Sequence, residues 1–142
     1  MSDTSERFIL WDEFHAHCKV LVDTLKHHGP FTGIIAIARG GLIPAGIIST
    51  QLDIRNVDSI AIQSYDGRTK RGHTIHKMPS LAGGGILVID DLSDSGGTLR
   101  YVRTLYPDVH IATVYAKPAG LDAVDSYVEC INQDCWIHFP WE

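Results

Sequence analysis

Short and nearly continuous apolar segments alternate with segments of helical periodicity along this chain of 142 residues. The apolar segments are too short for helices of ordinary length, so we predict strands at 33–38, 86–89 and 110–116, and another strand follows at 58–64. Strands that are apolar along their whole length are typical of a parallel sheet that is buried on both faces. We therefore expect one α/β domain over residues 1–142, with a parallel sheet and helices on both faces.

Three further segments are predicted to be helices. Asp12 is the expected N-cap of the first, in which apolar residues recur at helical spacing until a Gly-Pro pair ends it. The second covers Leu42–Leu52, and the third runs from about Ser95 to Tyr106. The segment 65–85 has no clear periodicity and is rich in glycine, which predicts a long loop of the kind that is usually functional or disordered.

Charge and cysteine content exclude several classes of protein. A net charge of −5 leaves no electrostatic footprint for binding nucleic acid. The longest apolar runs fall short of the roughly 20 residues that a transmembrane segment needs, and we expect no secretory leader. The three cysteines have no metal-site spacing and are predicted to be free thiols in a reducing cytoplasm. The eight histidines do not offer the closely spaced ligands of a structural zinc site.

The segment 86–98 carries the strongest functional signal. Its buried strand ends in two adjacent carboxylates, Asp90 and Asp91, and a short loop then leads through two glycines into a helix. Glycines let backbone N–H groups approach a phosphate at the positive end of that helix, and the hydroxyl groups of Ser95 and Thr98 can add donors. Carboxylates beside a phosphate would repel it unless they faced sugar hydroxyls or a metal. The combination predicts a phosphorylated sugar held near Mg²⁺.

Other phosphate-binding arrangements do not fit this chain. It has neither the G-x-x-x-x-G-K-[ST] sequence of a P-loop nor a G-x-G-x-x-G sequence after the first strand. A signalling receiver domain also combines an acidic pair with a later Lys-Pro, as in Lys117-Pro118. That fold places further strand and helix units between the two motifs, whereas only 25 residues separate Asp91 from Lys117 here.

The motif at 86–98 resembles the one with which the type I phosphoribosyltransferase family binds phosphoribosyl pyrophosphate. Similar segments extend over nearly the whole chain, and the later ones are closest to the 6-oxopurine branch, represented by bacterial xanthine-guanine phosphoribosyltransferases. Ser93 and Ser95 depart from the family, which more often has an apolar residue and a threonine there. The resemblance implies the type I fold, with a flexible lid loop at about 65–85 and a small hood formed by the chain ends. The similar segments are Ile37–Leu42, Ser64–Asp66, Val88–Thr98, Ala116–Gly120, Trp136–Ile137 and Pro140–Trp141.

The resemblance implies which residues bind phosphoribosyl pyrophosphate and the metal. Asp90 and Asp91 correspond to the pair that contacts the ribose hydroxyls and the water shell of Mg²⁺, with Asp91 as the metal residue and Asp90 as a second candidate through water. Arg39 corresponds to a pyrophosphate contact, in a turn that often contains a non-proline cis peptide in this family. The full set is Arg39, Gly40, Asp90, Asp91, Asp94, Ser95, Gly96, Gly97 and Thr98.

The resemblance also implies four residues that bind the purine. Asp94 corresponds to the carboxylate near N7 of the base, where it acts as a general acid or base. Lys117 would donate to O6, a bond that the amino group of a 6-aminopurine cannot accept. Trp136 would stack on the base, with a purely structural core aromatic as the alternative. The backbone of Ile137 would read the 2-position.

Three further residues are assigned to the lid by the same resemblance. Ser64 and Tyr65 lie at its base, and Arg71 matches a basic position that meets pyrophosphate and takes part in catalysis. For Arg71 the alternative is a solvated loop charge. A closing lid would keep water away from the oxocarbenium-like state at C1 of the sugar.

Together these features imply a cytoplasmic, Mg²⁺-dependent purine salvage enzyme. Its substrates would be phosphoribosyl pyrophosphate and a 6-oxopurine base (guanine, xanthine or hypoxanthine), and it would form a homodimer or homotetramer. Two alternatives stay open, namely a transferase for another base and a non-catalytic module that senses phosphoribosyl pyrophosphate. The second is disfavoured because the acidic chain has no basic patch for a nucleic-acid partner and because Asp94 is present.

Overall fold

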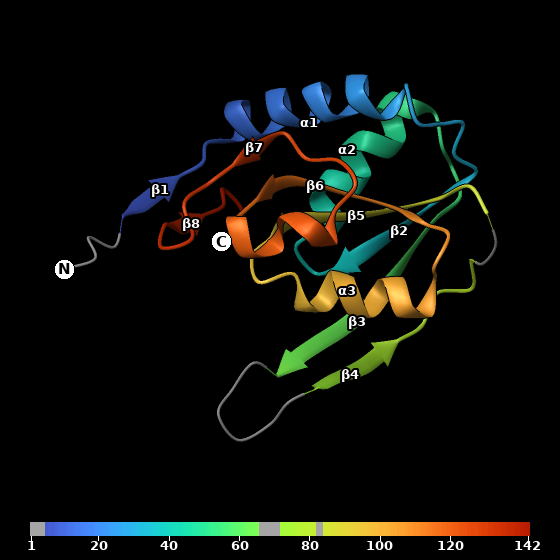
Figure 1. Ribbon diagram of the computed structural model, residues 1–142. Helices are drawn as coiled ribbons and strands as arrows, with labels where there is room; N and C mark the ends of the chain where they lie inside the picture. The colour runs from blue at the N-terminus through green and yellow to red at the C-terminus, as the bar shows by residue number, and fades with distance from the viewer. Residues whose placement is uncertain (1–4, 66–71, 82–83) are drawn as a thin grey trace.

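The central sheet of the computed structural model confirms the predicted α/β architecture (Figure 1). The structure describes residues 5–65, 72–81 and 84–142. Within them the main sheet has the order β4-β3-β2-β5-β6-β7, and every neighbouring pair is parallel except β3 with β4. The bounds are Gly33–Ala38 for β2, Val57–Tyr65 for β3, Gly72–Lys77 for β4, Ile86–Ser93 for β5, His110–Ala116 for β6 and Glu129–Cys130 for β7.

Helices cover both faces of this sheet because its central strands are apolar on both sides. Along β2, Ile34 and Ala36 belong to the core under α1 and α2, whereas Ile35 and Ile37 belong to a second core with α3. Figure 1 shows α1 and α2 on one side of the sheet and α3 on the other. The bounds are Trp11–Leu25 for α1, Leu42–Leu52 for α2, Gly97–Leu105 for α3 and Pro118–Ala123 for the 3₁₀ helix η1.

The two ends of the chain form the predicted hood. The strands β1 (Glu6–Phe8) and β8 (Trp136–His138) pair in parallel as a separate two-stranded sheet, with Arg7 opposite Ile137. The backbone pairing continues on both sides, because Trp136 N–H donates to the carbonyl of Ser5 at 2.8 Å and Ile9 N–H to that of His138 at 2.9 Å. The hood therefore depends on contacts between residues from opposite ends of the sequence.

The predicted helix starts need correction, although the helices themselves are confirmed. Asp12 is not an N-cap: α1 begins at Trp11, Leu10 is its N-cap residue without a side-chain cap, and Asp12 lies in the first turn. A carboxylate in that turn is stabilised by the positive end of the helix. Asp12 therefore does indicate the start of the helix, but from the first turn rather than from the N-cap position. The third helix begins at Gly97 rather than Ser95, because the preceding residues form the loop that leaves β5.

Two strands differ from their predicted form. The segment 65–85 is not a continuous loop, because it contains β4, which pairs antiparallel with β3. Backbone pairing rather than a buried apolar face holds this edge strand, so hydrophobic periodicity did not predict it. The strand β5 runs past the apolar segment 86–89 to Ser93, because its backbone stays paired with β6 beyond Asp90. In the described part of the chain, no helix has the length and apolarity to span a membrane.

Candidate active site

The carboxyl ends of β2 and β5 border a cavity of about 580 Å³. A Cβ atom at position 40 would lie 2.4 Å from Oδ2 of Asp91, so any side chain there would displace this carboxylate. The peptide bond between Ala38 and Arg39 is cis, as the family resemblance implied. The structure thus brings together five of the predicted residues around one cavity: Arg39, Gly40, Asp90, Asp91 and Thr98.

The two carboxylates of β5 lie in an environment that opposes their negative charge. Burial raises the pKa of Asp90 well above its ordinary value of 3.8, and the charge of Asp91 raises it further. Burial also raises the pKa of Asp91. The backbone N–H of Asp91 donates to Oδ1 of Asp90 at 2.8 Å. A bound cation would offset the repulsion between these side chains, which makes the pair a suitable site for a metal ion.

The donor set at this edge fits Mg²⁺. Mg²⁺ prefers oxygen ligands and is commonly bound by one or two carboxylates together with substrate phosphates. Asp90 and Asp91 supply such carboxylates beside a cavity wide enough for a substrate. Across residues 5–65, 72–81 and 84–142 there is no cluster of three or more His, Cys, Asp or Glu side chains that would hold a metal without substrate.

The loop between β5 and α3 surrounds a second, smaller cavity of about 170 Å³ that shares Asp90 and Thr98 with the first. Gly96 has φ 87°, a left-handed conformation that favours glycine and turns the chain into α3. The hydroxyl oxygen of Ser95 accepts a hydrogen bond from the N–H of Gly97 at 3.4 Å. Arg100 stabilises the loop by donating to the carbonyl of Ser95 at 2.9 Å. The predicted phosphate-binding residues Ser95 to Thr98 all line this cavity, together with Asp94.

Asp94 and Lys117 lie next to each other at the ends of β5 and β6. Nζ of Lys117 is 3.6 Å from Oδ2 of Asp94, and the lysine side chain is 6% exposed while the aspartate is 58% exposed. The hydroxyl group of Ser93 donates to the carbonyl of Gly120 at 2.8 Å, which joins the end of β5 to η1. Ser93 is buried, so its departure from the family pattern has a structural role here. The pair presents a cation and a carboxylate side by side, partly open to solvent.

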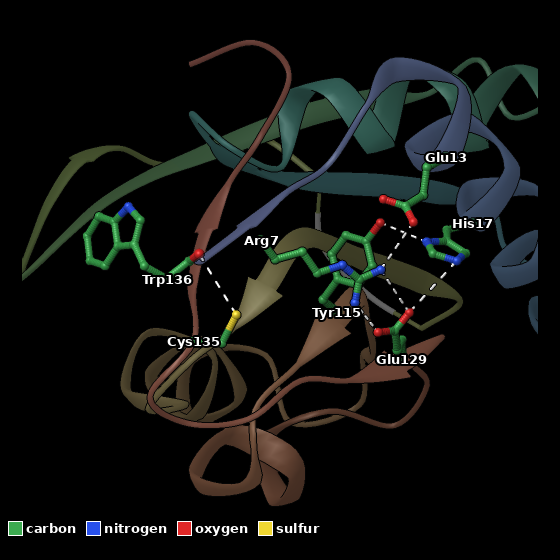
Figure 2. Close-up of polar contacts among 7 residues, drawn as sticks. All are labelled: Arg7, Glu13, His17, Tyr115, Glu129, Cys135 and Trp136. Atoms are coloured by element: carbon green, nitrogen blue, oxygen red, sulfur yellow. Dashed lines mark hydrogen bonds and ion pairs between the residues drawn. The ribbon is translucent and has the colours of Figure 1, made fainter. Parts of the chain in front are cut away.

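Trp136 and Ile137 occupy the hood strand β8. Trp136 is 64% exposed, which excludes the alternative of a core aromatic, while Ile137 is buried. Figure 2 shows the indole of Trp136 pointing away from a polar cluster around Arg7 on the other side of the strand. In that cluster Arg7 contacts Glu129 and Glu13, and the Tyr115 hydroxyl lies 2.7 Å from Nδ1 of His17. The hood therefore offers an exposed aromatic face and is attached to the main body through Arg7.

Comparison with known proteins identifies the family. The phosphoribosyl transferase domain family matches residues 11–142. The chain belongs to the phosphoribosyltransferase family. A xanthine-guanine phosphoribosyltransferase from Nitratidesulfovibrio vulgaris (strain Hildenborough) is 47% identical over 135 residues, which cover 94% of this chain and 83% of that protein. One from Cereibacter sphaeroides is 46% identical over 142 residues, covering 94% of this chain and 85% of that protein.

Solved structures agree with this assignment. A purine phosphoribosyltransferase from Pyrococcus horikoshii superposes with a TM-score of 0.84 at 29% identity, covering 97% of this chain and 94% of that one. A Helicobacter pylori xanthine-guanine-hypoxanthine phosphoribosyltransferase, at 24% identity and a TM-score of 0.81, shares the fold. The predicted type I fold and the resemblance to bacterial xanthine-guanine enzymes are confirmed, and the chain is a transferase of this family.

Three predicted residues of this phosphoribosyltransferase are not placed at the site. Ser64 and Tyr65 form the end of β3, next to the start of the predicted lid, and only their backbone is described. Arg71 lies outside the described residues. The lid assignments therefore stay predictions.

The structure adds to the phosphoribosyltransferase site a residue that the sequence did not reveal. Gln133, in the segment between β7 and β8, donates from Nε2 to Oδ1 of Asp94 at 2.8 Å. Arg100 was also missed, although it donates to the carbonyl of Ala119 at 2.8 Å and pairs with Asp122. Neither residue belongs to a recognised motif, and the contacts of Gln133 with Asp94 and of Arg100 with Ala119 cross 39 and 19 positions of the sequence. Their only sequence signal is proximity to Trp136 and to the glycine-rich loop.

Proposed function

We propose that this phosphoribosyltransferase transfers ribose 5-phosphate from phosphoribosyl pyrophosphate to N9 of a 6-oxopurine, namely guanine, xanthine or hypoxanthine. The observation that carries the proposal is the contact of Asp94 with the buried Lys117, 3.6 Å apart, beside the phosphate-binding loop. A lysine ammonium group only donates hydrogen bonds, so it can bind the oxygen of a 6-oxopurine but not the amino group of adenine. The names of the xanthine-guanine relatives support the same substrates.

In the proposed reaction the bond from C1 of the ribose to pyrophosphate breaks, and pyrophosphate leaves with its electron pair. The lone pair on N9 of the purine forms the new bond to C1, and the proton on N7 passes to the carboxylate of Asp94. Lys117 would hold O6 and stabilise the negative charge that develops on the base. Trp136 would cover one face of the ring while the backbone of Ile137 faces its 2-position.

The remaining residues would hold the sugar and its phosphates. Asp90 and Asp91 would accept hydrogen bonds from the ribose hydroxyls, the loop from Ser95 to Thr98 would bind the 5′-phosphate, and Arg39 with Gly40 would face pyrophosphate. Mg²⁺ held by Asp91, and by Asp90 through water, would supply charge neutralisation for the departing pyrophosphate. The two adjoining cavities and the raised pKa values of the two carboxylates support this arrangement.

A homodimer or homotetramer in the cytoplasm is part of the same proposal. Phe8, Leu10 and Trp11 are 66%, 70% and 52% exposed, and such large apolar side chains close together support contact with a second copy of the chain. Cys18, Cys130 and Cys135 are all free, which suits a reducing compartment. Light scattering coupled to size-exclusion chromatography tests the assembly, and a monomer at micromolar concentration would contradict it.

The decisive experiment incubates the purified protein with phosphoribosyl pyrophosphate, Mg²⁺ and, separately, guanine, xanthine, hypoxanthine and adenine. We expect nucleotide and pyrophosphate from at least one 6-oxopurine and none from adenine. Turnover of adenine would overturn the assigned role of Lys117. Binding of phosphoribosyl pyrophosphate without turnover of any base would favour the sensing module.

A pair of lysine variants tests the residue that carries the proposal. Lys117→Met keeps the length of a buried side chain and removes its donor, so we expect kcat/KM for a 6-oxopurine to fall at least about 100-fold. Lys19→Met removes an exposed lysine of α1 and is expected to leave turnover unchanged. Equal activity of the two variants would contradict selection of the 6-oxo group by Lys117.

A further inference from the structure

Gln133 connects the carboxylate of Asp94 to the turn that carries Lys117. Its Nε2 donates to Oδ1 of Asp94 at 2.8 Å, and its Oε1 accepts the backbone N–H of Ala119 at 2.8 Å. These two bonds assign the orientation of the amide group, because the N–H of Ala119 needs an acceptor and an ionised carboxylate needs a donor. The side chain therefore bridges two parts of the site that lie 39 and 14 positions before Gln133 in the sequence.

The anchor at Ala119 is itself held in place. Arg100 donates to the carbonyl of Ala119 at 2.8 Å, and the Ser93 hydroxyl donates to the next carbonyl, that of Gly120, also at 2.8 Å. The N–H of Lys117 donates to the carbonyl of Ser93 at 2.9 Å, which fixes the start of the same turn. Gln133 is thus attached to a fixed part of the backbone rather than to a free loop.

The two oxygens of Asp94 consequently have different neighbours. Oδ1 receives the neutral amide donor of Gln133 at hydrogen-bond distance, whereas Oδ2 faces the ammonium group of Lys117 at 3.6 Å. A 6-oxopurine that draws the Lys117 donor to its O6 leaves Oδ2 as the oxygen available to the ring nitrogen. With 58% of its side chain exposed, Asp94 has little packing of its own to hold this orientation.

We infer that Gln133 is a positioning residue, which holds Oδ1 of Asp94 so that Oδ2 exchanges the proton with N7 of the base. The catalytic part of this inference rests on the proposed function. Without the amide donor the carboxylate can rotate, and a smaller fraction of bound substrate meets Oδ2 in a reactive geometry. The loss should appear in kcat rather than in the KM for phosphoribosyl pyrophosphate, because every predicted contact to that substrate except Asp94 comes from another residue.

Two substitutions separate the two bonds of Gln133. Gln133→Glu has the same shape and can still accept the N–H of Ala119, but it cannot donate to an ionised Asp94. Gln133→Leu removes both bonds. We expect kcat to fall about 10-fold in each variant, a part of what general acid–base catalysis supplies, with the KM for phosphoribosyl pyrophosphate unchanged. The matched control is Asn132→Asp, the same amide-to-carboxylate change at the preceding exposed residue.

A double-mutant cycle distinguishes positioning from a general structural role. If Gln133 acts through the carboxylate of Asp94, Gln133→Leu should cause no further loss of kcat in an Asp94→Asn background. Full kcat in Gln133→Glu, or the same loss in both backgrounds, would overturn the inference.

Crystal structures of the wild type and of Gln133→Leu test the placement without any activity. We expect Oδ1 of Asp94 to lie on Gln133 in the wild type and the carboxylate to change its orientation in the variant. An unchanged Asp94 in the variant would refute the positioning role even in an active enzyme. If Asp94 is reoriented in the variant but the wild type turns over no base, the positioning of Asp94 by Gln133 is supported and the proposed function is refuted.

Discussion

The guanidinium group of Arg7 in β1 pairs with the carboxylate of Glu129 in β7, 122 positions later in the chain, with Nη2 3.1 Å from Oε1 (Figure 2). The same guanidinium lies 3.3 Å from Glu13 of α1 and 5.8 Å from the centre of the Tyr115 ring in β6. Since β1 is hydrogen-bonded to β8, this pair joins the hood to the edge of the main sheet. The hood in turn carries Trp136 and Ile137, the residues proposed to contact the base.

Loss of this connection should loosen the base site more than the sugar site. Arg7→Met keeps the apolar stem and removes the ion pairs, and we expect the KM for the base to rise about fivefold, equivalent to about 1 kcal/mol. The KM for phosphoribosyl pyrophosphate should not change, because its predicted contacts lie in the turn after β2, at the end of β5, and in the loop and first turn of α3. Steady-state kinetics with each substrate varied in turn measure both constants, with Lys19→Met as the control. An equal rise in both KM values would contradict a role confined to the hood.

The same pair predicts a pH dependence of stability. The hydrogen bond from Arg7 lowers the pKa of Glu129 below its ordinary value of 4.5. A lowered pKa in the folded state stabilises the protein above the unfolded pKa, and this contribution is lost as the pH falls through the folded pKa. The free energy of unfolding of the wild type should therefore exceed that of Glu129→Gln by up to about 1 kcal/mol at neutral pH, because both side chains are partly exposed.

Urea unfolding at several pH values measures this difference. It should be constant above about pH 4.5 and should shrink at lower pH as Glu129 becomes protonated. Asp23→Asn, which removes an exposed carboxylate elsewhere on α1, controls for the change in net charge. A difference that persists undiminished in acid would show that the ion pair does not cause it.

The raised pKa of Asp90 predicts that replacing this residue increases the stability of the protein and reduces its activity. A carboxylate whose folded-state pKa lies above 3.8 reduces stability as the pH rises through that range, because the folded protein holds the proton more tightly. Asp90→Asn should therefore raise the free energy of unfolding by about 1 kcal/mol at neutral pH without metal. It should also lower kcat/KM about 100-fold if the carboxylate serves the ribose and Mg²⁺.

Thermal unfolding with and without Mg²⁺ and phosphoribosyl pyrophosphate separates these two effects. The two ligands should raise the Tm of the wild type and should raise that of Asp90→Asn less, since the variant retains fewer ligand oxygens. A metal-free variant less stable than the wild type would mean that the paired charges are not unfavourable in the folded protein.

The parts of the fold that depend on local pattern could be predicted from the sequence. Buried on both faces, β2 and β6 leave nearly continuous apolar runs, and their bounds agree with the prediction. The edge strand β4 depends on backbone hydrogen bonds to the preceding strand β3, and β1 depends on backbone hydrogen bonds to β8 from the other end of the chain. Such pairing leaves little periodicity in either partner, because neither strand is obliged to be apolar.

The same distinction applies to the candidate site. Asp90, Asp91 and Asp94 were recognised because they share one compact motif with the glycines of the phosphate loop, and Lys117 because it follows a strand in a second motif. Gln133 and Arg7 act through single side chains that reach across the fold, and neither belongs to a sequence motif that would predict its role. Residues that position others are therefore harder to find from sequence than those expected to contact substrate.

Because Trp136 is exposed, its role in base stacking can be tested without a large change in protein stability. With 64% of its surface exposed, its replacement by alanine should change the free energy of unfolding by less than about 0.5 kcal/mol. If the indole stacks on the purine, Trp136→Ala should raise the KM for the base about 10-fold, and Trp136→Phe should recover most of it. Tyr127→Ala removes another exposed aromatic ring and should alter neither quantity. Equal KM values for Trp136→Ala and Trp136→Phe would show that an aromatic face at this position does not contribute to binding the base.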